Sequence, residues 1–327
     1  MATITLLLPE RTRLPGPLPA AIGRVLGRAD RAEGERGSQA QLRRHFRLVP
    51  DHWPVAALTR RVDAGDNFDG SGGNVADAWL RADPAHVAPD LNGARLLGWG
   101  EGLGLEADDV RALLPALRPL FGDAGFQLDA PHPARWYLRL PEGTRLPALP
   151  GPEEAVGDDL FAALPQGGDA AARRWRALIT EVQVVLHQHP RNRERAAQGK
   201  PAINALWFWG AGRLPASVQS RYLHVRSPDP LLQGLAQMAG AATSAPAAAD
   251  GGAAGDSLVD MRRLRSMDML AAQALPPLLQ AMARREFDAL QLDFEDGACF
   301  RLQHGQRRWQ FWRRPLAILA DAPGTTA

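Results

Sequence analysis

The sequence has one cysteine, one lysine and no long apolar run, and each scarcity excludes a class of protein. Cys299 alone cannot form an intramolecular disulfide framework or a cysteine-rich metal cluster. The apolar run near the start, residues 4–8, stops at Pro9. It is far shorter than the ~20 apolar residues that cross a bilayer, and it lacks the basic flank of a secretion signal. We therefore expect a soluble, cytoplasmic protein.

Lys200 stands beside 37 arginines among the 38 basic residues. Because the formal net charge is only +2, this imbalance indicates a GC-rich coding sequence more than a nucleic-acid-binding role. The chain has 327 residues, of which 45% are hydrophobic, so it can bury a large core in one or two domains. Nucleic acid is therefore not an expected partner.

Hydrophobic periodicity predicts strands that alternate with helices. Short apolar or alternating runs predict strands at residues 4–8, 79–90, 96–98, 135–140, 204–209 and 223–225. Amphipathic spacing predicts helices over residues 18–26, 39–45, 107–121, 171–187, 230–238 and 275–287. A hairpin of residues 290–294 and 299–302 follows, with residues 307–312 as a third strand. This order predicts an α/β fold, a central mixed or parallel sheet flanked by helices, with a C-terminal antiparallel hairpin element.

Residues 241–257 are rich in alanine and glycine, which predicts a flexible low-complexity segment. The segment follows a predicted α/β domain, residues 1–240, and precedes residues 258–327, predicted as a helix plus antiparallel strands. We expect this C-terminal part to pack on the same domain.

The richest polar cluster lies in residues 180–215, TEVQVVLHQHPRNRERAAQGKPAINALWFWGAGRLP. His187 and His189 fall where the helix ends, because the residue before a proline disfavours helical geometry. Three interpretations stay open: histidines that fix a turn, a small-ligand site, or a metal site, for which a third ligand at recognisable spacing is missing. The same segment contributes three further candidate ligand-binding residues, Asn192, Arg195 and Asn204.

A second polar cluster, made of Arg81, Asp83, His86 and Asp90, lies on a predicted strand that enters a turn. Arginine binds carboxylate or phosphate bidentately, so the first three residues are candidates for binding an anion. The alternative is a turn at Asp83-Pro84 with an incidental salt bridge. The chain contains neither the phosphate-loop spacings nor G-x-S-x-G, and we assign no catalytic residue and no metal ligand.

The segment RRWQFWRR, residues 307–314, interleaves arginine with aromatic residues. Its candidate protein-binding residues are Arg307, Trp309, Trp312 and Arg314. The same pattern suits single-stranded nucleic acid or a charged edge strand with one aromatic face in the core. Cys299 falls inside the preceding hairpin, where we expect it to be packed rather than nucleophilic.

Several stretches together resemble a known bacterial family: WLRADPAHVAPD, RWYLRLP, HQHPRNRERAAQGKPAINALWFWGAGRLP and LHVRSPDPLLQGLAQMAG. They are similar to the RpfE-type regulatory proteins, which are also described as cofactor-independent phosphoglycerate-mutase-like. The resemblance runs from about Leu6 to Pro315. Residues 202–240 also resemble archaeal-type phosphoglycerate mutases, through Asn204, Trp207 and Trp209 and the helix that follows. The resemblance implies an alkaline-phosphatase-superfamily fold, whose active members use two divalent metals and a serine nucleophile.

The chain departs from that pattern at the metal positions. Active members begin with a strand that ends in Asp-Gly, whereas here Leu8 is followed by Pro9-Glu10. They also carry a late Asp-His pair, and none follows residue 240. We therefore expect a regulatory or small-anion-binding protein on a mutase-like scaffold, without metal-dependent catalysis and without a cofactor.

Two alternatives remain open. The first is an active 2,3-bisphosphoglycerate-independent phosphoglycerate mutase or phosphatase that uses manganese or zinc. The second is a protein-interaction module that uses the residue 307–314 segment.

Overall fold

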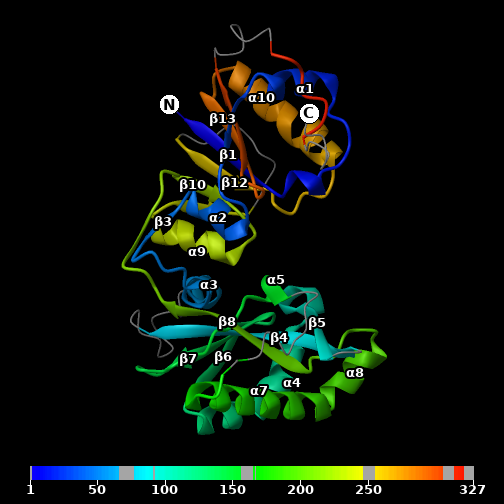
Figure 1. Ribbon diagram of the computed structural model, residues 1–327, viewed down its shortest axis with the longest axis vertical. Helices are drawn as coiled ribbons and strands as arrows, with labels where there is room; N and C mark the ends of the chain where they lie inside the picture. The colour runs from blue at the N-terminus through cyan, green and yellow to red at the C-terminus, as the bar shows by residue number, and fades with distance from the viewer. Residues whose placement is uncertain are drawn as a thin grey trace. The chain divides into compact units, whose positions relative to one another are not determined.

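The chain forms two compact units (Figure 1) in a computed structural model that describes residues 2–65, 77–90, 93–155, 165, 167–245, 255–304 and 313–319. Unit 1 combines Met1–Asp51 with Ser217–Ala327, and unit 2 is His52–Ala216. Unit 2 is therefore one continuous stretch inserted between two segments of unit 1. Each unit has its own sheet and its own hydrophobic core.

Unit 1 contains a seven-stranded mixed sheet with the order β11-β10-β12-β1-β13-β14-β2. The parallel strands are β11 (Ala242–Ser244), β10 (His224–Arg226), β12 (Ser257–Asp260), β1 (Thr3–Leu8) and β13 (Ala289–Phe294). Two antiparallel strands complete it, β14 (Ala298–Gln303) and β2 (Asp30–Glu33). All six residues of β1 are buried, as expected for a strand between two parallel neighbours.

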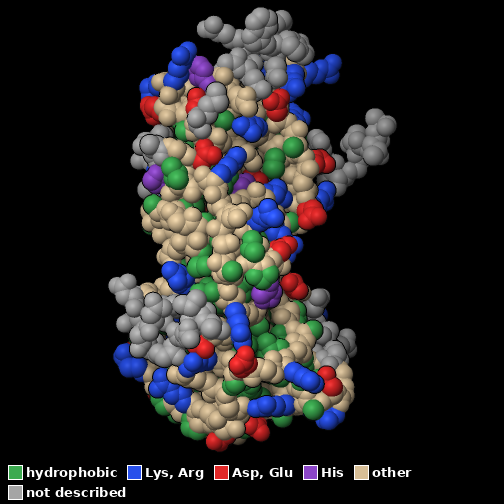
Figure 2. Space-filling view, turned by 90° about the vertical axis from the view of Figure 1, so that its left-hand side faces the viewer, with side chains coloured by type: hydrophobic (Ala, Val, Ile, Leu, Met, Phe, Trp, Pro, Cys, Tyr) green, Lys and Arg blue, Asp and Glu red, His purple; other side chains and the backbone are tan. Residues whose placement is uncertain are grey.

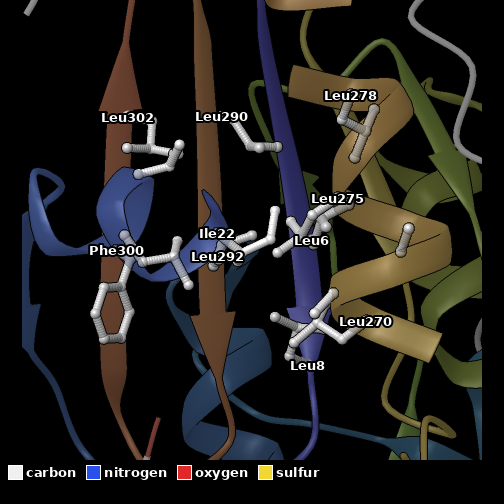
Figure 3. Close-up of a cluster of buried hydrophobic side chains, with 14 of the residues drawn as sticks. Leu6, Leu8, Ile22, Leu270, Leu275, Leu278, Leu290, Leu292, Phe300 and Leu302 are labelled. Carbon is white, nitrogen blue, oxygen red and sulfur yellow. The ribbon is translucent and has the colours of Figure 1, made fainter. Parts of the chain in front are cut away.

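Helices cover the unit 1 sheet and supply part of its core. They are η1 (Arg11–Arg13), α1 (Ala20–Gly27), α2 (Ser38–Arg43), α9 (Pro230–Met238), a π-helical turn (Met269–Ala274) and α10 (Leu275–Ala283). Figure 3 shows leucines of β1 and β13 facing Ile22 of α1 and three leucines of the last helical segment: Leu270, Leu275 and Leu278. Full burial of one such side chain contributes roughly 1.5–3 kcal/mol, so this cluster is a major source of stability. A separate short pair, β3 (Arg47–Val49) with β9 (Ser217–Gln219), completes unit 1.

Unit 2 contains an antiparallel sheet centred on β4 (Ala78–Asp90), which pairs with β5 (Gly93–Trp99), β7 (Arg135–Leu140) and β8 (Ala205–Arg213). The strand β6 (Gln127–His132) pairs with β7. The helices are α3 (Val55–Ala64), η3 (Gly100–Leu103), α4 (Ala107–Asp123), α5 (Pro152–Ala155), α7 (Ala170–Gln188) and α8 (Arg191–Ala197). Residues of α4 and α7 share a core with Trp136 and Phe208. Residues of α3 pack with Trp79 and Tyr137 on the other face.

Local sequence explains where the main helices of unit 2 begin and end. Glu106 and Asp109 form a reciprocal capping box at the start of α4. Asp169 caps α7 by accepting a hydrogen bond from the Ala172 N–H at 2.6 Å. The helix α7 ends at Gln188, because His189 precedes a proline and takes extended geometry.

Most of the predicted elements are confirmed. The strand at 4–8, the helix at 230–238 and the hairpin at 290–302 lie within one or two residues of their predicted bounds. In β8, Phe208 faces one core while Trp207 and Trp209 face another, as strand alternation requires. The α/β fold with a central mixed sheet flanked by helices is also as predicted.

The arrangement in space differs from the sequence-based division in several respects. The predicted domain boundary was residue 240, whereas the units divide after Asp51 and after Ala216. The reason is tertiary pairing: β1 lies between β12 and β13, so both chain ends share one sheet. Within the predicted flexible segment, Ala242–Ser244 forms β11, and residues 246–254 lie outside the described part.

Three element boundaries also differ from the prediction. The strand next to the β13–β14 hairpin is β2, and residues 307–312, predicted for this place, lie outside the described part. The helix predicted at 275–287 ends at Ala283. The strand predicted to enter a turn near Asp83 continues to Asp90, because β4 pairs with β8 as far as Ala85 and with β5 from there to Asp90. In the described residues, no helix is long and apolar enough to cross a membrane.

Candidate functional site

The carboxyl edge of the parallel strands in unit 1 gathers polar side chains, and ligands of open α/β sheets bind at this edge. The strands β10, β12 and β13 end at Arg226, Asp260 and Phe294. Two networks lie there. The first is Ser227, Asp229, Asp260 and Arg262, and the second is Gln41, Arg44, His45, Tyr222 and Asp293.

In the first network, Arg262 joins two carboxylates. Its Nη2 donates to Asp229 Oδ2 at 2.8 Å and to Asp260 Oδ2 at 2.7 Å, and its Nε donates to Asp260 Oδ1 at 2.9 Å. The Ser227 hydroxyl donates to Asp260 Oδ2 at 2.6 Å. Asp229 Oδ1 also caps α9 by accepting from the Leu231 N–H at 2.9 Å. The guanidinium group therefore occupies the place between the two carboxylates where a metal ion would have to lie.

The charges of this network stabilise one another. Burial would raise the pKa of Asp260, but the bonds from Arg262 and Ser227 outweigh burial and lower that pKa below its ordinary value. Burial likewise opposes the charge of Arg262, yet Asp260 and Asp229 raise the Arg262 pKa. Both groups are therefore charged at neutral pH.

The second network joins α2 and the two residues after it, β1, and Tyr222 just before β10 to β13, around Asp293, whose side chain is fully buried. Arg44 binds Asp293 through two donors, at 3.0 and 2.6 Å, and His45 Nε2 lies 2.8 Å from Asp293 Oδ2. His45 Nδ1 lies 2.8 Å from the hydroxyl of Tyr222, which also lies 3.1 Å from Thr5 Oγ1. Burial would raise the Asp293 pKa, but His45 and Arg44 lower it. Because Tyr222 is 2% exposed, this chain of bonds is closed to a substrate and positions strands.

These networks do not fit a site for divalent metals. Each of the carboxylates Asp229, Asp260 and Asp293 is already bound by a guanidinium group. In the described residues, no group of three or more His, Cys, Asp or Glu side chains is placed to hold a metal ion. A two-metal phosphoryl-transfer site needs free carboxylate and imidazole ligands, and the residues at this edge do not supply them.

In unit 2, Arg81 and Asp83 form a buried ion pair. Arg81 Nε and Nη2 donate to the two Asp83 oxygens, each at 2.8 Å, and Trp209 Nε1 donates to Asp83 Oδ2 at 2.8 Å. The exposed fractions are 5% for Arg81 and 0% for Asp83. Burial opposes the charge of Arg81, but Asp83 raises its pKa. These side chains bind each other, which agrees with the salt-bridge alternative for this cluster.

His86 and Asn204 lie close together and fix neighbouring strands. His86 Nδ1 lies 2.9 Å from the carbonyl oxygen of Ala202. The amide of Asn204 pairs with Val87, accepting from its N–H at 2.9 Å and donating to its carbonyl at 2.7 Å. Asn204 thereby extends the pairing of β4 beyond the start of β8.

Asn192 and Arg195 bond to the same part of unit 2. The Asn192 amide donates to Leu186 O and Ile203 O, both at 2.8 Å, and accepts from the Ile203 N–H at 2.8 Å. Arg195, 1% exposed, donates to Asp109 Oδ2 at 2.7 Å and to two backbone carbonyls, Leu103 O at 2.6 Å and Pro201 O at 2.9 Å. These bonds fix the loop from α8 to β8.

His187 and His189 are not brought together with the other candidates. His187 is exposed near the end of α7, and His189 Nδ1 accepts a hydrogen bond from the Arg191 N–H at 3.2 Å. His189 therefore agrees with the turn-fixing interpretation. Ligand binding by the eight predicted residues remains a prediction. All eight lie in unit 2, in separate groups rather than around one site.

The C-terminal candidates lie mostly outside the described residues. This holds for Arg307, Trp309 and Trp312, whereas Arg314 is described and exposed. On the face drawn in Figure 2, basic side chains are interspersed with acidic ones rather than gathered in one basic patch. Burial raises the pKa of Cys299 to about 12, so its thiol is protonated at neutral pH and a poor nucleophile, as expected.

The sequence analysis missed the residues of the unit 1 edge and most of one group in unit 2, of which it named Arg81 as a candidate. We call this group the arginine–aromatic core: Arg60, Trp79, Arg81, Tyr137 and Trp209. One sequence feature could have indicated the edge residues, since Asp260 ends a short apolar strand. Little in the sequence indicated the arginine–aromatic core, because the helix α3, which carries Arg60, was not predicted.

No known protein family has a sequence profile that matches the chain. Among curated proteins, the chain is similar to a probable 2,3-bisphosphoglycerate-independent phosphoglycerate mutase of Geobacter sulfurreducens. The two are 26% identical over 165 residues, which are 50% of this chain and 38% of that protein. The 2,3-bisphosphoglycerate-independent phosphoglycerate mutase of Methanothrix thermoacetophila is 26% identical over 185 residues, 53% of this chain and 46% of that protein. The chain thus spans less than half the length of these relatives.

Among solved structures, the chain is similar to the cofactor-independent phosphoglycerate mutase of Thermoplasma acidophilum. That comparison covers 93% of this chain and 90% of the other, with 16% identity and a TM-score of 0.42. The chain is similar to cofactor-independent phosphoglycerate mutases.

Proposed function

We propose that this protein binds a small anion in a regulatory role, on a scaffold similar to the phosphoglycerate mutases, and has no metal-dependent phosphoryl transfer. The observation that carries the second part is the ion pairing of Arg262 with Asp229 and Asp260. The guanidinium group already engages oxygens of both carboxylates, whereas a catalytic metal ion needs such oxygens as ligands in order to polarise a phosphoryl oxygen. The absence of an Asp-Gly at the end of the first strand and of a late Asp-His pair supports the same conclusion.

The anion-binding part of the proposal rests on the similarity to the phosphoglycerate mutases. The curated relatives are named as mutases of a phosphorylated carboxylate, phosphoglycerate. Arginine side chains suit both phosphate and carboxylate, so a chain similar to these proteins can bind such an anion without a metal ion. The "regulatory" role follows from the RpfE-type resemblance.

A thermal-shift panel on metal-stripped protein tests this function. The ligands are Mn²⁺, Zn²⁺, Mg²⁺, 3-phosphoglycerate and inorganic phosphate, singly and combined, and mutase turnover is assayed on the same samples. A ligand at 100 times its dissociation constant adds about 2.7 kcal/mol to the free energy of unfolding. We expect stabilisation by an anion alone and no turnover with any metal.

The alternative function is an active phosphoglycerate mutase, which the curated relatives favour. It requires stabilisation that depends on metal and phosphoglycerate together, accompanied by turnover. That result would refute the proposed function.

A further inference from the structure

Arg60, on α3 in unit 2, is buried without a full set of hydrogen-bond acceptors. The residue is 2% exposed, and its Nη2 lies 2.8 Å from Asp129 Oδ2. Its Nε and Nη1 are buried and bond to no acceptor in the described part of the chain. A buried N–H group without an acceptor is strongly destabilising, and native proteins satisfy almost all such groups with protein, water or an ion. These two donors therefore indicate a binding partner.

Trp79 supplies a third unpaired donor at the same place. The Arg60 Cζ lies 4.1 Å from the centre of the Trp79 ring, and Trp79 Nε1 is buried with no acceptor among the described residues. A ring face attracts a cation, but it offers no lone pair to an N–H group. The guanidinium group lies against the ring that carries Nε1, so the unpaired donors of both side chains belong to the same buried part of unit 2.

The charge of Arg60 is less compensated than that of its neighbours. Arg81 binds both oxygens of Asp83, and Arg135 binds both oxygens of Asp63 at 2.8 and 2.7 Å. In both cases the carboxylate outweighs burial and raises the arginine pKa. For Arg60 burial outweighs Asp129, whose side chain is 34% exposed, and the arginine pKa is lowered.

We propose that Arg60 and Trp79 bind one small anion, of the size of chloride or bicarbonate, between α3 and β4. An anion supplies the missing acceptor and compensates the charge at once, whereas a water molecule supplies only the acceptor. The size limit follows from burial, because Arg60 is 2% and Trp79 3% exposed. This site rests on the proposed function, anion binding. It specifies where in unit 2 an anion binds and how large that anion can be.

The test measures thermal unfolding of the full chain at constant ionic strength. Sodium gluconate is replaced stepwise by sodium chloride, bromide, nitrate or bicarbonate, so that screening stays fixed while the small anion changes. We expect the midpoint to rise with the logarithm of the small-anion concentration, by about 3–6 °C for each tenfold increase above the dissociation constant. We compare the midpoint shifts in nitrate and bicarbonate with those in chloride and bromide. The comparison shows whether the site prefers a planar oxyanion or a halide.

Two variants and one control locate the effect. Trp79→Phe keeps an aromatic ring but removes the N–H group, and Arg60→Met removes the cation. Both should lose the anion-dependent shift. Arg174→Met is the control, because Arg174 also lies over an aromatic ring, Phe126 at 5.5 Å, but is exposed. It should keep the full shift.

Crystals grown in bromide give a second, independent readout, since bromide scatters anomalously. An anomalous peak in contact with Arg60 and Trp79 is expected. A shift that persists in Trp79→Phe, no concentration-dependent shift with any small anion, or a water molecule without bromide signal would each overturn the site. No shift with any small anion, together with stabilisation by phosphoglycerate, would overturn this site while leaving the proposed function intact, whereas metal-dependent turnover would overturn that function alone.

Discussion

The carboxyl edge of the unit 1 sheet and the arginine–aromatic core of unit 2 both bury guanidinium groups, but they neutralise them differently. At the edge, Arg262 contacts two carboxylates, and its pKa is raised. In unit 2, Arg60 lies on an aromatic ring and contacts one half-exposed carboxylate, and its pKa is lowered. Bidentate carboxylates compensate the cost of burying a guanidinium charge, and an aromatic face with one weak ion pair does not.

This difference teaches how far a scaffold can change its chemistry while it keeps its architecture. The edge of unit 1 has the geometry of a ligand site, yet its carboxylates are bound by arginines of the same chain. The arginine–aromatic core has the appearance of plain packing, yet it contains the unpaired donors. The location of a ligand is therefore better judged from unsatisfied groups than from the density of polar residues.

The largest expected effect is from breaking a fully matched pair in unit 2. Arg195→Ala removes one buried donor from Asp109 and the guanidinium donors of two backbone carbonyls, and we expect it to lower the free energy of unfolding by about 3–5 kcal/mol. Urea denaturation measures this loss. Arg193→Ala, on the exposed side of the same short helix α8, is the control and should change stability by less than about 0.5 kcal/mol. A stable Arg195→Ala protein with weakened ligand binding would instead restore Arg195 as a ligand-binding residue.

A slightly smaller effect is expected at the unit 1 edge. Arg262→Ala removes the cation between Asp229 and Asp260 and should cost about 3 kcal/mol, less than a fully buried pair because the Arg262 side chain is 16% exposed. Mn²⁺ or Ca²⁺ should then restore part of the melting temperature of the variant, because two carboxylates and a hydroxyl oxygen are left without a cation. Wild-type protein should show no such rescue. If Arg262→Ala/Asp260→Asn were rescued equally well, the metal would be binding elsewhere.

The acid dependence of stability gives a third comparison. The pKa values of Asp260 and Asp293 are lowered in the folded state, so their contribution is present above the unfolded pKa near 4 and is lost as the pH falls toward the folded values. Asp293→Asn should therefore reduce the slope of stability against pH in this range, by up to about 1.4 kcal/mol per pH unit. Denaturation curves at several pH values measure it. Asp268→Asn, at an exposed position, should leave the slope unchanged.

The smallest effect is expected where the charge is least compensated. In gluconate buffer without small anions, Arg60→Met should change the free energy of unfolding by no more than about 1 kcal/mol, because methionine removes a poorly paired buried charge and fills similar space. The part-exposed Asp129 is left hydrated. Urea denaturation beside Arg195→Ala checks the contrast. If Arg60→Met lowered the free energy of unfolding as much as Arg195→Ala, the charge of Arg60 would be well compensated. The contrast between Arg60 and the fully paired arginines would then be wrong.

The individual elements of this fold could be predicted well from the sequence, and the candidate site could not. The apolar run at 4–8 and the amphipathic spacing at 230–238 are local signals, and both elements lie where they were predicted. His187 and Asn192 were grouped because they are near in sequence, yet Asn192 is buried and fixes backbone, whereas His187 is exposed. Sequence proximity does not report which polar groups already bind each other.

The sequence by itself determined most of the longer helices and strands, the departure from the metal-binding pattern at Pro9-Glu10, and the resemblance to the mutases. Only the tertiary structure decided that β1 lies between β12 and β13, that residues 52–216 form a separate unit, and that Arg262 pairs with both Asp229 and Asp260. The physical reason is the sequence separation over which each kind of interaction acts. Periodicity and capping act over a few residues along the chain, whereas strand pairing and ion pairing join residues separated by as many as 286 positions.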